Sequence, residues 1–198
     1  MCGGYTLSSS TEALTDLFKV RMVPELNPRN NIAPTQPVAA VRQPSEGERE
    51  IVLLHWGLTP SWAKDPDIGN RLFNARSETV AEKPAFRSAF KHRRCLIPTD
   101  GFYEWQRVGE RKQPYYIQLV DGGPFAFAGL WEHWEGPENL VIESCTILTT
   151  EANALVRSLH NRMPLIIDPS GVDKAGDSAG GREDREVLIL GGRIVAVF

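Results

Sequence analysis

The middle of the chain carries a series of short apolar and aromatic segments separated by clusters of Gly, Asp and Pro. Segments of this length between turn residues predict several strands joined by tight connections. A turn signal, Pro-Thr-Asp-Gly at 98–101, precedes the segment 102–106. The strand candidates are 51–58, 102–106, 114–119, 124–131 and 144–148. Such a chain folds around a β-rich centre.

Three further segments show helical periodicity, and each contains a residue suited to begin a helix. These are the segment through Phe18, with Ser9 and Glu12 at capping-box spacing; 85–90, after Pro84; and 152–159, capped by Thr149 or Thr150 and stopped by Pro164. The residues between Asn27 and Pro37 predict an extended surface segment. We therefore expect an α+β fold with a β-rich centre and helices at its periphery.

Composition places the chain among globular proteins. Apolar residues make up 41% of the 198 residues and include five Trp and eight Phe, which is enough for a sizeable core. No apolar run approaches the ~20 residues that a membrane span needs, so we expect no membrane partner. Residues 170–185 are rich in Gly, Ser, Asp and Lys and predict a flexible linker, followed by two strands around Gly191-Gly192.

The charges are distributed unevenly along the chain. The formal net charge of -3 argues weakly against a nucleic-acid partner. Residues 71–112, however, hold ten Lys and Arg against five acids, which leaves the rest of the chain strongly acidic. Because only the local field acts on a polyanion, this region is compatible with an anion-binding surface. A solvated face with cations at helix ends would give the same composition.

The cysteine pattern argues against a metal centre. The three cysteines, Cys2, Cys95 and Cys145, form no C-x-x-C pair and are odd in number. A zinc site or a disulfide framework is therefore not indicated, and we expect no metal and no cofactor. The start of the chain has neither a basic nor an apolar signal region, so we expect a protein of the reducing cytoplasm.

Cys2 combines two nucleophiles once the initiator Met is removed. Its α-amine and thiol have reference pKa values of about 7.7–8.0 and 8.5, so both are partly in the nucleophilic form near neutrality. A 1,2-aminothiol condenses with an aldehyde to an imine and then closes to a thiazolidine ring. The same pair can attack an amide, as in hydrolases with an amino-terminal nucleophile. The alternative is that Cys2 is a frayed terminal residue without a role.

Three other places offer groups for acid–base and anion chemistry. Asn74 and Arg76 stand two residues apart in FNARSE, so both can point to one side of an extended strand. Glu104 lies between Tyr103 and Trp105, where a carboxylate shielded by aromatic rings can serve as a proton donor. His160 falls at the end of the apolar face of the third predicted helix, beside Arg162; a buried structural histidine is the alternative there.

Taken together, the motifs resemble one family. MCGGYTL, NNIAPTQ, HWGLTPSWAKD, FNARSET, LIPTDGFYEW, FAFAGLWEHW, CTILTTEAN and LHNRMPLII are similar, in order and spacing, to the SOS response associated peptidase (SRAP) family. The resemblance implies a single SRAP-like domain with a barrel-like centre. It also implies a protein of the DNA damage response that recognises abasic sites in single-stranded DNA and crosslinks to them through the amino-terminal Cys as a thiazolidine. A nucleoid-associated state on DNA and a monomer are expected.

The resemblance assigns catalytic roles to four residues. It makes Cys2 the crosslinking residue and Asn74 the amide that orients the terminal amine and the product ring. It makes Glu104 the carboxylate that assists opening of the sugar and proton transfer, and His160 the imidazole that helps open the sugar and can drive reversal. Since an imine permits β-elimination, an AP-lyase activity is expected as a side path. Removal of Met1 by the protein itself is a further expected activity.

Three residues are implied in DNA binding. Arg76 and Arg162 match arginines that hold phosphates beside the lesion, and Trp62 is placed to stack on a base, as aromatic side chains do in single-strand binders. Gly4 stands where the family usually has Arg, so one phosphate contact is expected to be missing. The resemblance covers residues 1–167, and residues 168–198 are expected to form a divergent segment.

Two other functions remain open from the residues alone. An amidohydrolase similar to the glutaminase domains of class II amidotransferases also begins Met-Cys-Gly, but the later motifs do not fit that family. A non-catalytic single-stranded DNA binder would use the basic region 71–112 and would not need Cys2.

Overall fold

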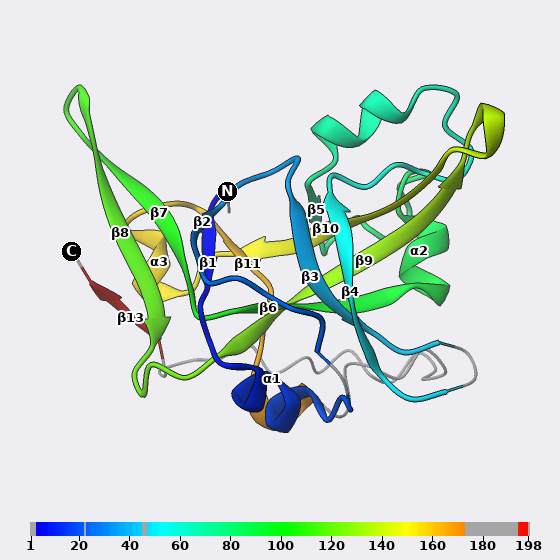
Figure 1. The fold of residues 1–198 in the computed structure, drawn as a ribbon. Helices are drawn as coiled ribbons and strands as arrows, with labels where there is room; N and C mark the ends of the chain where they lie inside the picture. Colours follow the sequence, from blue (N-terminus) through cyan, green and yellow to red (C-terminus); the bar gives the residue numbers. More distant parts are fainter. Residues whose placement is uncertain (1–2, 22, 45–46, 173–193, 198) are drawn as a thin grey trace.

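A computed structural model describes residues 3–21, 23–44, 47–172 and 194–197 (Figure 1). The strands are β1 (Tyr5–Leu7), β2 (Arg29–Ile32), β3 (Pro37–Arg42), β4 (Glu50–Trp56), β5 (Asn74–Arg76), β6 (Arg94–Thr99), β7 (Gly101–Val108), β8 (Arg111–Leu119), β9 (Phe125–Glu135), β10 (Val141–Glu151), β11 (Arg162–Pro164), β12 (Ile166–Ile167) and β13 (Ile194–Val197). The helices are α1 (Thr11–Phe18), α2 (Arg87–His92) and α3 (Ala154–Arg157), with 3₁₀ turns η1 (Pro66–Arg71), η2 (Pro137–Asn139) and η3 (Pro169–Gly171).

Five strands close into a barrel. The hydrogen-bonded order runs β10-β4-β3-β6-β9, and β9 pairs in turn with β10, which completes the circuit. All of these pairs are antiparallel except β4 with β10. A closed barrel has no free edges among its own strands. The expected α+β fold with a barrel-like centre and peripheral helices is confirmed.

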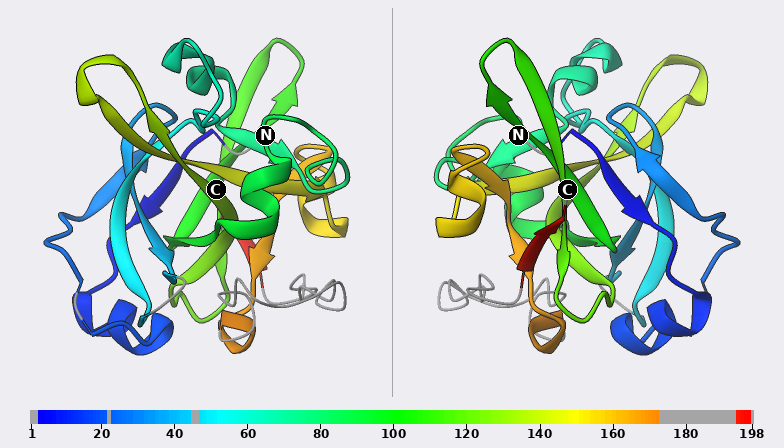
Figure 2. Two further views of the ribbon diagram at one scale, coloured as in Figure 1. Left: turned by 90° about the vertical axis from the view of Figure 1, so that its right-hand side faces the viewer. Right: turned by 90° about the vertical axis from the view of Figure 1, so that its left-hand side faces the viewer.

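A second sheet lies against the barrel, in the order β13-β8-β7-β1-β2. Its long β7–β8 hairpin projects beyond the barrel (Figures 1 and 2). The last strand, β13, pairs antiparallel with β8, from Ile194 opposite Leu119 to Val197 opposite Tyr116. Residues 194–197 therefore extend this sheet. The predicted linker beyond residue 172 and the Gly191-Gly192 turn lie outside the described residues.

Aromatic rings join the two sheets. Tyr5 of β1 is fully buried and packs edge-on against Trp56 at 5.4 Å and against Phe127 at 5.8 Å between ring centroids. Phe102 of β7 packs edge-on against the same Phe127, at 5.7 Å. Edge-to-face pairs at these distances add to the gain from burial alone. This packing fixes β1, and with it Gly4, against β7 and the barrel.

The first helix forms as expected, but its cap is one residue later than predicted. The Ser10 hydroxyl accepts a hydrogen bond from the Ala13 N–H, while Ser9 bonds through its N–H and hydroxyl to Asp100. Ser9, which the capping-box spacing favoured as the cap, is therefore bonded to Asp100 instead. The second helix begins two residues later than predicted, because Pro84 lies in a turn ahead of α2.

The third predicted helix is largely wrong. Thr149 and Thr150, its expected caps, belong to β10, which continues to Glu151 and pairs there with β11. The helix is reduced to α3, whose cap is Asn153; its side chain accepts from the Val156 N–H. Pro164 ends a strand rather than a helix. Strand pairing on both edges of β10 outweighs the local helical periodicity.

The basic region 71–112 does not form one continuous surface. Its cations on α2 and on the β7–β8 hairpin lie on opposite sides of the molecule (Figure 1). Arg93 is moreover paired with the buried Glu132 at 2.8 Å. The sum of charges along the sequence therefore overstates the charge at any single site.

Candidate functional site

The sequence-predicted residues lie on β5, on β7, which pairs with β1, and in the turn between α3 and β11. Cys2, the proposed nucleophile, lies outside the described residues. Tyr5 is paired with Phe102 of β7, and the Gly4 carbonyl accepts a hydrogen bond from the Tyr103 N–H at 3.0 Å. Glu104 is the next residue on that strand. The beginning of the described chain is therefore held alongside the strand that carries Glu104.

Strand β5 presents Asn74 and Arg76. It pairs in parallel with β10, Asn74 opposite Ile147 and Arg76 opposite Thr149. The buried indole of Trp56 donates to the Phe73 carbonyl at 2.8 Å, which anchors the residue before the strand. Side chains two residues apart share one side of a strand. Asn74 is half-buried and Arg76 is exposed, so the amide lies deeper than the guanidinium.

Glu104 is a buried carboxylate, with only 2% of its surface exposed. It stands opposite Tyr115 in the β7–β8 ladder. The strand begins at Gly101, where a Cβ would lie 2.4 Å from the Tyr116 ring, so only glycine allows this approach. A buried carboxylate on the strand beside Gly4 is placed to exchange protons with a group bound there.

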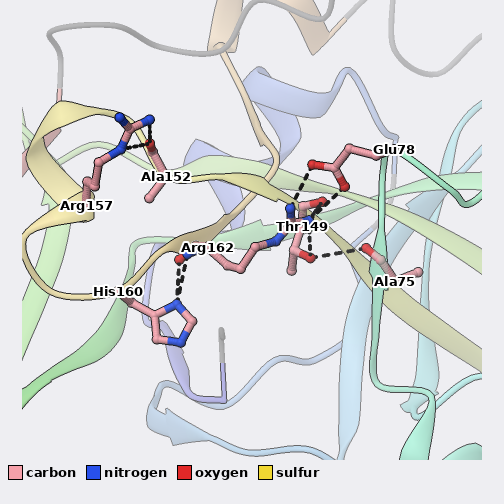
Figure 3. Close-up of polar contacts among 7 residues, drawn as sticks. All are labelled: Ala75, Glu78, Thr149, Ala152, Arg157, His160 and Arg162. Atoms are coloured by element: carbon pink, nitrogen blue, oxygen red, sulfur yellow. Dashed lines mark hydrogen bonds and ion pairs between the residues drawn. The ribbon is translucent and has the colours of Figure 1, made fainter.

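His160 is half-buried in the turn after α3 (Figure 3). Its Nδ1 accepts a hydrogen bond from the Arg162 N–H at 2.9 Å and lies 3.1 Å from the Arg162 carbonyl oxygen. The neutral ring therefore carries its proton on Nε2, which points away from Arg162 in Figure 3. In the cationic ring Nδ1–H can donate to the carbonyl, so both protonation states have a partner in the same place.

Arg162 is held by groups of the protein itself. Nη1 and Nη2 donate to the two Glu78 carboxylate oxygens at 2.7 and 3.0 Å, and Nη2 also donates to the Thr149 carbonyl at 2.6 Å and to its hydroxyl at 3.1 Å (Figure 3). Its side chain is 13% exposed. The guanidinium pulls the pKa of Glu78 below its usual value. The predicted phosphate contact of Arg162 stays a prediction.

A side-chain bridge joins the strand of Glu104 to the turn of His160. Gln106 Nε2 donates to the Ser158 carbonyl at 3.2 Å, and the Tyr115 hydroxyl donates to Gln106 Oε1 at 2.9 Å. Because Gln106 and Glu104 lie two residues apart, they share one face of β7. The bridge thus holds this face next to the segment that leads to His160.

Trp62 lies apart from these residues, in the connection between β4 and β5. It is 60% exposed, and its indole N–H donates to the Pro84 carbonyl at 3.3 Å. A surface hollow of about 490 Å³ opens beside it, lined by Trp62, Ala63, Lys64, Asp65, Asp67, Ile68 and Arg71. Two cations and two acids line this hollow, so the exposed indole itself is the group that can accept a nucleic-acid base.

Sequence reasoning missed Glu78, Thr149 and Gln106. Glu78 stands 84 residues from its partner Arg162, and no local pattern reveals such a pair. Thr149 was assigned to a helix cap. Gln106 looked like an ordinary strand residue, although its place two residues after Glu104 was a usable signal.

The described residues hold no group of three or more His, Cys, Asp or Glu side chains arranged to bind a metal ion. Within the same residues, no helix has the length and apolar character needed to cross a membrane.

Comparisons with known proteins agree with the motifs. The family model described as SOS response associated peptidase (SRAP) matches residues 1–186. Abasic site processing protein YoaM of Bacillus subtilis is 43% identical over 171 residues, covering 84% of this chain and 75% of that protein. Abasic site processing protein HMCES of Xenopus tropicalis is 36% identical over 143 residues, covering 61% of this chain and 43% of the relative.

Solved structures share the fold. A crystal structure of a protein from Bordetella bronchiseptica superposes with a TM-score of 0.84 at 27% identity, covering 98% of each chain. A protein from Bacteroides thetaiotaomicron gives a TM-score of 0.87 at 23% identity, covering 98% of this chain and 90% of that one.

Proposed function

The chain belongs to the SOS response associated peptidase (SRAP) family, and from this premise we propose that it captures abasic sites in single-stranded DNA as a covalent thiazolidine at Cys2. Its relatives in Bacillus and Xenopus are named abasic site processing proteins, which supports the substrate. The observation that carries the proposal is the pairing of Gly4 with Tyr103, which holds the first described residues against the strand of the buried Glu104.

The first step is release of the aldehyde. An abasic deoxyribose exists mainly as a closed hemiacetal, so a proton must reach the ring oxygen while the hydroxyl loses its own. His160 suits the role of hydrogen-bond donor to that oxygen, because its neutral form carries a proton on Nε2 and keeps Nδ1 bonded to Arg162. The Glu104 carboxylate takes up the hydroxyl proton and passes it to the ring oxygen, so neither side chain has changed its protonation state when the aldehyde is released.

The second step joins protein and DNA. The Cys2 amine adds to the aldehyde carbon, and the resulting carbinolamine loses one water to give the imine; Glu104 takes a proton from the nitrogen and passes it to the departing hydroxyl. The thiol sulfur then adds to the imine carbon, and its proton moves to the nitrogen, which closes the ring. Asn74 can orient the amine through its side-chain amide. If ring closure is slow, the imine allows β-elimination, so weak lyase activity accompanies capture.

Arg76 and Trp62 supply contacts to the rest of the strand. Arg76 is exposed next to Asn74 and can bind a phosphate beside the lesion. Trp62 can stack on a base further along the strand. Met1 must be removed before Cys2 has a free amine, and the same nucleophile can carry out that cleavage.

The test is capture of an oligonucleotide that carries one abasic site. The purified chain, with removal of Met1 verified by mass, should form a species that survives denaturing electrophoresis. Its mass should equal protein plus DNA minus one water. An oligonucleotide with a tetrahydrofuran analogue, which has no aldehyde, should bind without forming this species. If the chain lacking Met1 gives no adduct, the proposal is wrong.

Cysteine variants provide the control. Cys2→Ala should abolish the adduct, whereas Cys145→Ala should leave it unchanged. Cys145 is fully buried, and burial raises the pKa of its thiol, so it stays protonated and out of reach of DNA. Persistence of the adduct in Cys2→Ala would assign capture to another nucleophile.

A further inference from the structure

The Arg162 guanidinium is bonded to Glu78 and Thr149, and we call these three residues the clamp. Two hydrogen bonds go to the Glu78 carboxylate and two go to Thr149, one to its carbonyl and one to its hydroxyl. The fork of the guanidinium matches a carboxylate in bidentate geometry, so the side chain is held in one orientation. The backbone of Arg162 is paired with Glu151 across β10 and β11, and the clamp adds a second restraint through the side chain.

Thr149 lies at the point where two short strands flank β10. On one edge it is opposite Arg76 of β5, and on the other it is opposite Pro164 of β11. Its hydroxyl also donates to the Ala75 carbonyl at 3.3 Å, and its own carbonyl accepts from the Ser77 N–H at 2.9 Å. The clamp thus ties the strand that presents Asn74 to the strand that begins at Arg162.

The backbone of Arg162 in turn orients His160. The Arg162 N–H is the donor to His160 Nδ1, and this bond favours the tautomer that carries the proton on Nε2. A shift of the Arg162 backbone would weaken the bond and let the ring exchange between tautomers. The Nε2 proton, which the proposed reaction uses, would then be present for only part of the time.

We propose that Glu78 and Thr149 are positioning residues that hold His160 in its reactive tautomer through Arg162. The inference rests on the proposed function for its consequence in catalysis, but its structural part can be tested without DNA. Stability alone is a weak reason for the clamp, because a largely buried arginine loses hydration that one ion pair recovers only in part. Arg162 Nε is itself buried without a hydrogen-bond partner among the described residues.

The chain contains a matched control at a second arginine. Arg42 is 15% exposed and bonds Glu50 at 2.8 Å and Glu143 at 2.7 Å, and Glu50 is 43% exposed. The corresponding values at the clamp are 13% for Arg162 and 44% for Glu78. Glu50→Gln therefore makes the same chemical change as Glu78→Gln, at an ion pair of equal exposure that does not contact His160.

The first measurement is the ¹⁵N chemical shifts of the His160 ring in the free protein near neutral pH. Wild type and Glu50→Gln should show an unprotonated Nδ1 and a protonated Nε2. In Glu78→Gln both shifts should move toward the average of the two tautomers. Thr149→Val, which removes only the hydroxyl, should shift them in the same direction, and Thr149→Ser should restore the wild-type values. His160→Ala identifies the signals.

The second measurement separates binding from chemistry. With saturating abasic oligonucleotide, the rate of adduct formation should fall about tenfold in Glu78→Gln, as expected for a misplaced catalytic group. The Kd for the tetrahydrofuran analogue should not rise, because the change removes a negative charge near DNA. If Glu78 instead restrained a phosphate-binding Arg162, both affinity and rate would increase, which overturns the proposal.

The two proposals fail in different ways. Wild-type ring shifts in both Glu78→Gln and Thr149→Val would overturn the positioning role, whether or not the protein captures DNA. Absence of any adduct in the wild type would overturn the proposed function and leave the ring shifts as the test of the clamp. If Glu78→Gln does not fold, the comparison of Thr149→Val with Thr149→Ser decides.

Discussion

Gln106 donates a hydrogen bond from its side-chain amide to the carbonyl oxygen of Ser158, at 3.2 Å. This contact joins two segments separated by 52 residues. One is the strand that carries Glu104, and the other is the turn that leads to His160. The proposed reaction needs both side chains to act on the same sugar, so this single bridge has a direct bearing on their alignment.

Replacement of Gln106 by Met should therefore slow capture more than it destabilises the fold. Loss of one partly exposed hydrogen bond should cost about 1 kcal/mol in the free energy of unfolding. Misalignment of Glu104 and His160 should lower the rate of adduct formation severalfold at saturating DNA. Urea unfolding and single-turnover kinetics measure the two effects.

The residue opposite Gln106 supplies the control. Gln113 pairs with Gln106 across the hairpin, but its amide donates to the adjacent Pro114 carbonyl and not to the His160 turn. Gln113→Met should leave the rate unchanged. Equal rates for the two variants would show that the bridge to Ser158 has no part in alignment.

Gly4 offers a site at which DNA affinity can be raised. A Cβ at this position would meet its nearest neighbours, Asn31 and Tyr103, at 3.7 Å, which is ordinary van der Waals contact. Gly4→Arg should thus be accommodated and should add a phosphate contact. We expect a lower Kd for single-stranded DNA and a salt dependence that is steeper by about 0.7 in log–log slope.

Gly4→Gln tests whether charge is the cause, since glutamine has a long polar side chain without the cation. Titrations of the tetrahydrofuran oligonucleotide at several salt concentrations give both quantities. A tighter Kd for Gly4→Gln with an unchanged salt slope would attribute the gain to contacts other than a phosphate.

Local sequence patterns predicted the fold well where the strands are long. The segments at 51–58 and 102–131 combine aromatic or β-branched residues with clear turn signals, and they form β4, β7, β8 and β9. Patterns failed at Thr149 and Thr150, where pairing with β5 and β11 decided the conformation. A strand of three residues such as β5 has too few positions to show any periodicity.

The candidate site was predictable in part for the same reason. Asn74, Glu104 and His160 each stand in a distinctive local motif, so their chemistry could be inferred before their positions were known. The clamp on Arg162 could not be inferred, because Glu78 and Thr149 reach it only through tertiary pairing. An arginine expected to face a phosphate is therefore found facing a carboxylate of its own chain.

Gly101 should tolerate no side chain. A Cβ there would lie 2.4 Å from the Tyr116 ring and 2.8 Å from the Ile117 carbonyl oxygen. Gly101→Ala must push β7 and β8 apart, and overpacking of this kind costs about 1–3 kcal/mol. Thermal unfolding measures the loss.

Gly109→Ala is the comparison in the same hairpin. A Cβ there meets nothing within 4 Å, so the variant is destabilised only by the strain of an alanine at the positive φ of 61°. Equal losses would contradict the clash.

Stability should fall at alkaline pH because of two buried thiols. Burial raises the pKa of Cys95 and Cys145 above the ordinary value of 9.0. As the pH rises past 9.0, the unfolded chain releases these protons while the folded chain keeps them, so the free energy of unfolding decreases, by about 1.4 kcal/mol per pH unit for each thiol. Burial also raises the pKa of Tyr116, which adds to the loss near pH 10.

Urea unfolding from pH 7 to 10 should show this decline in the free energy of unfolding, with a shallower slope in Cys145→Ala. An equal slope in that variant would mean that the Cys145 thiol ionises in the folded protein.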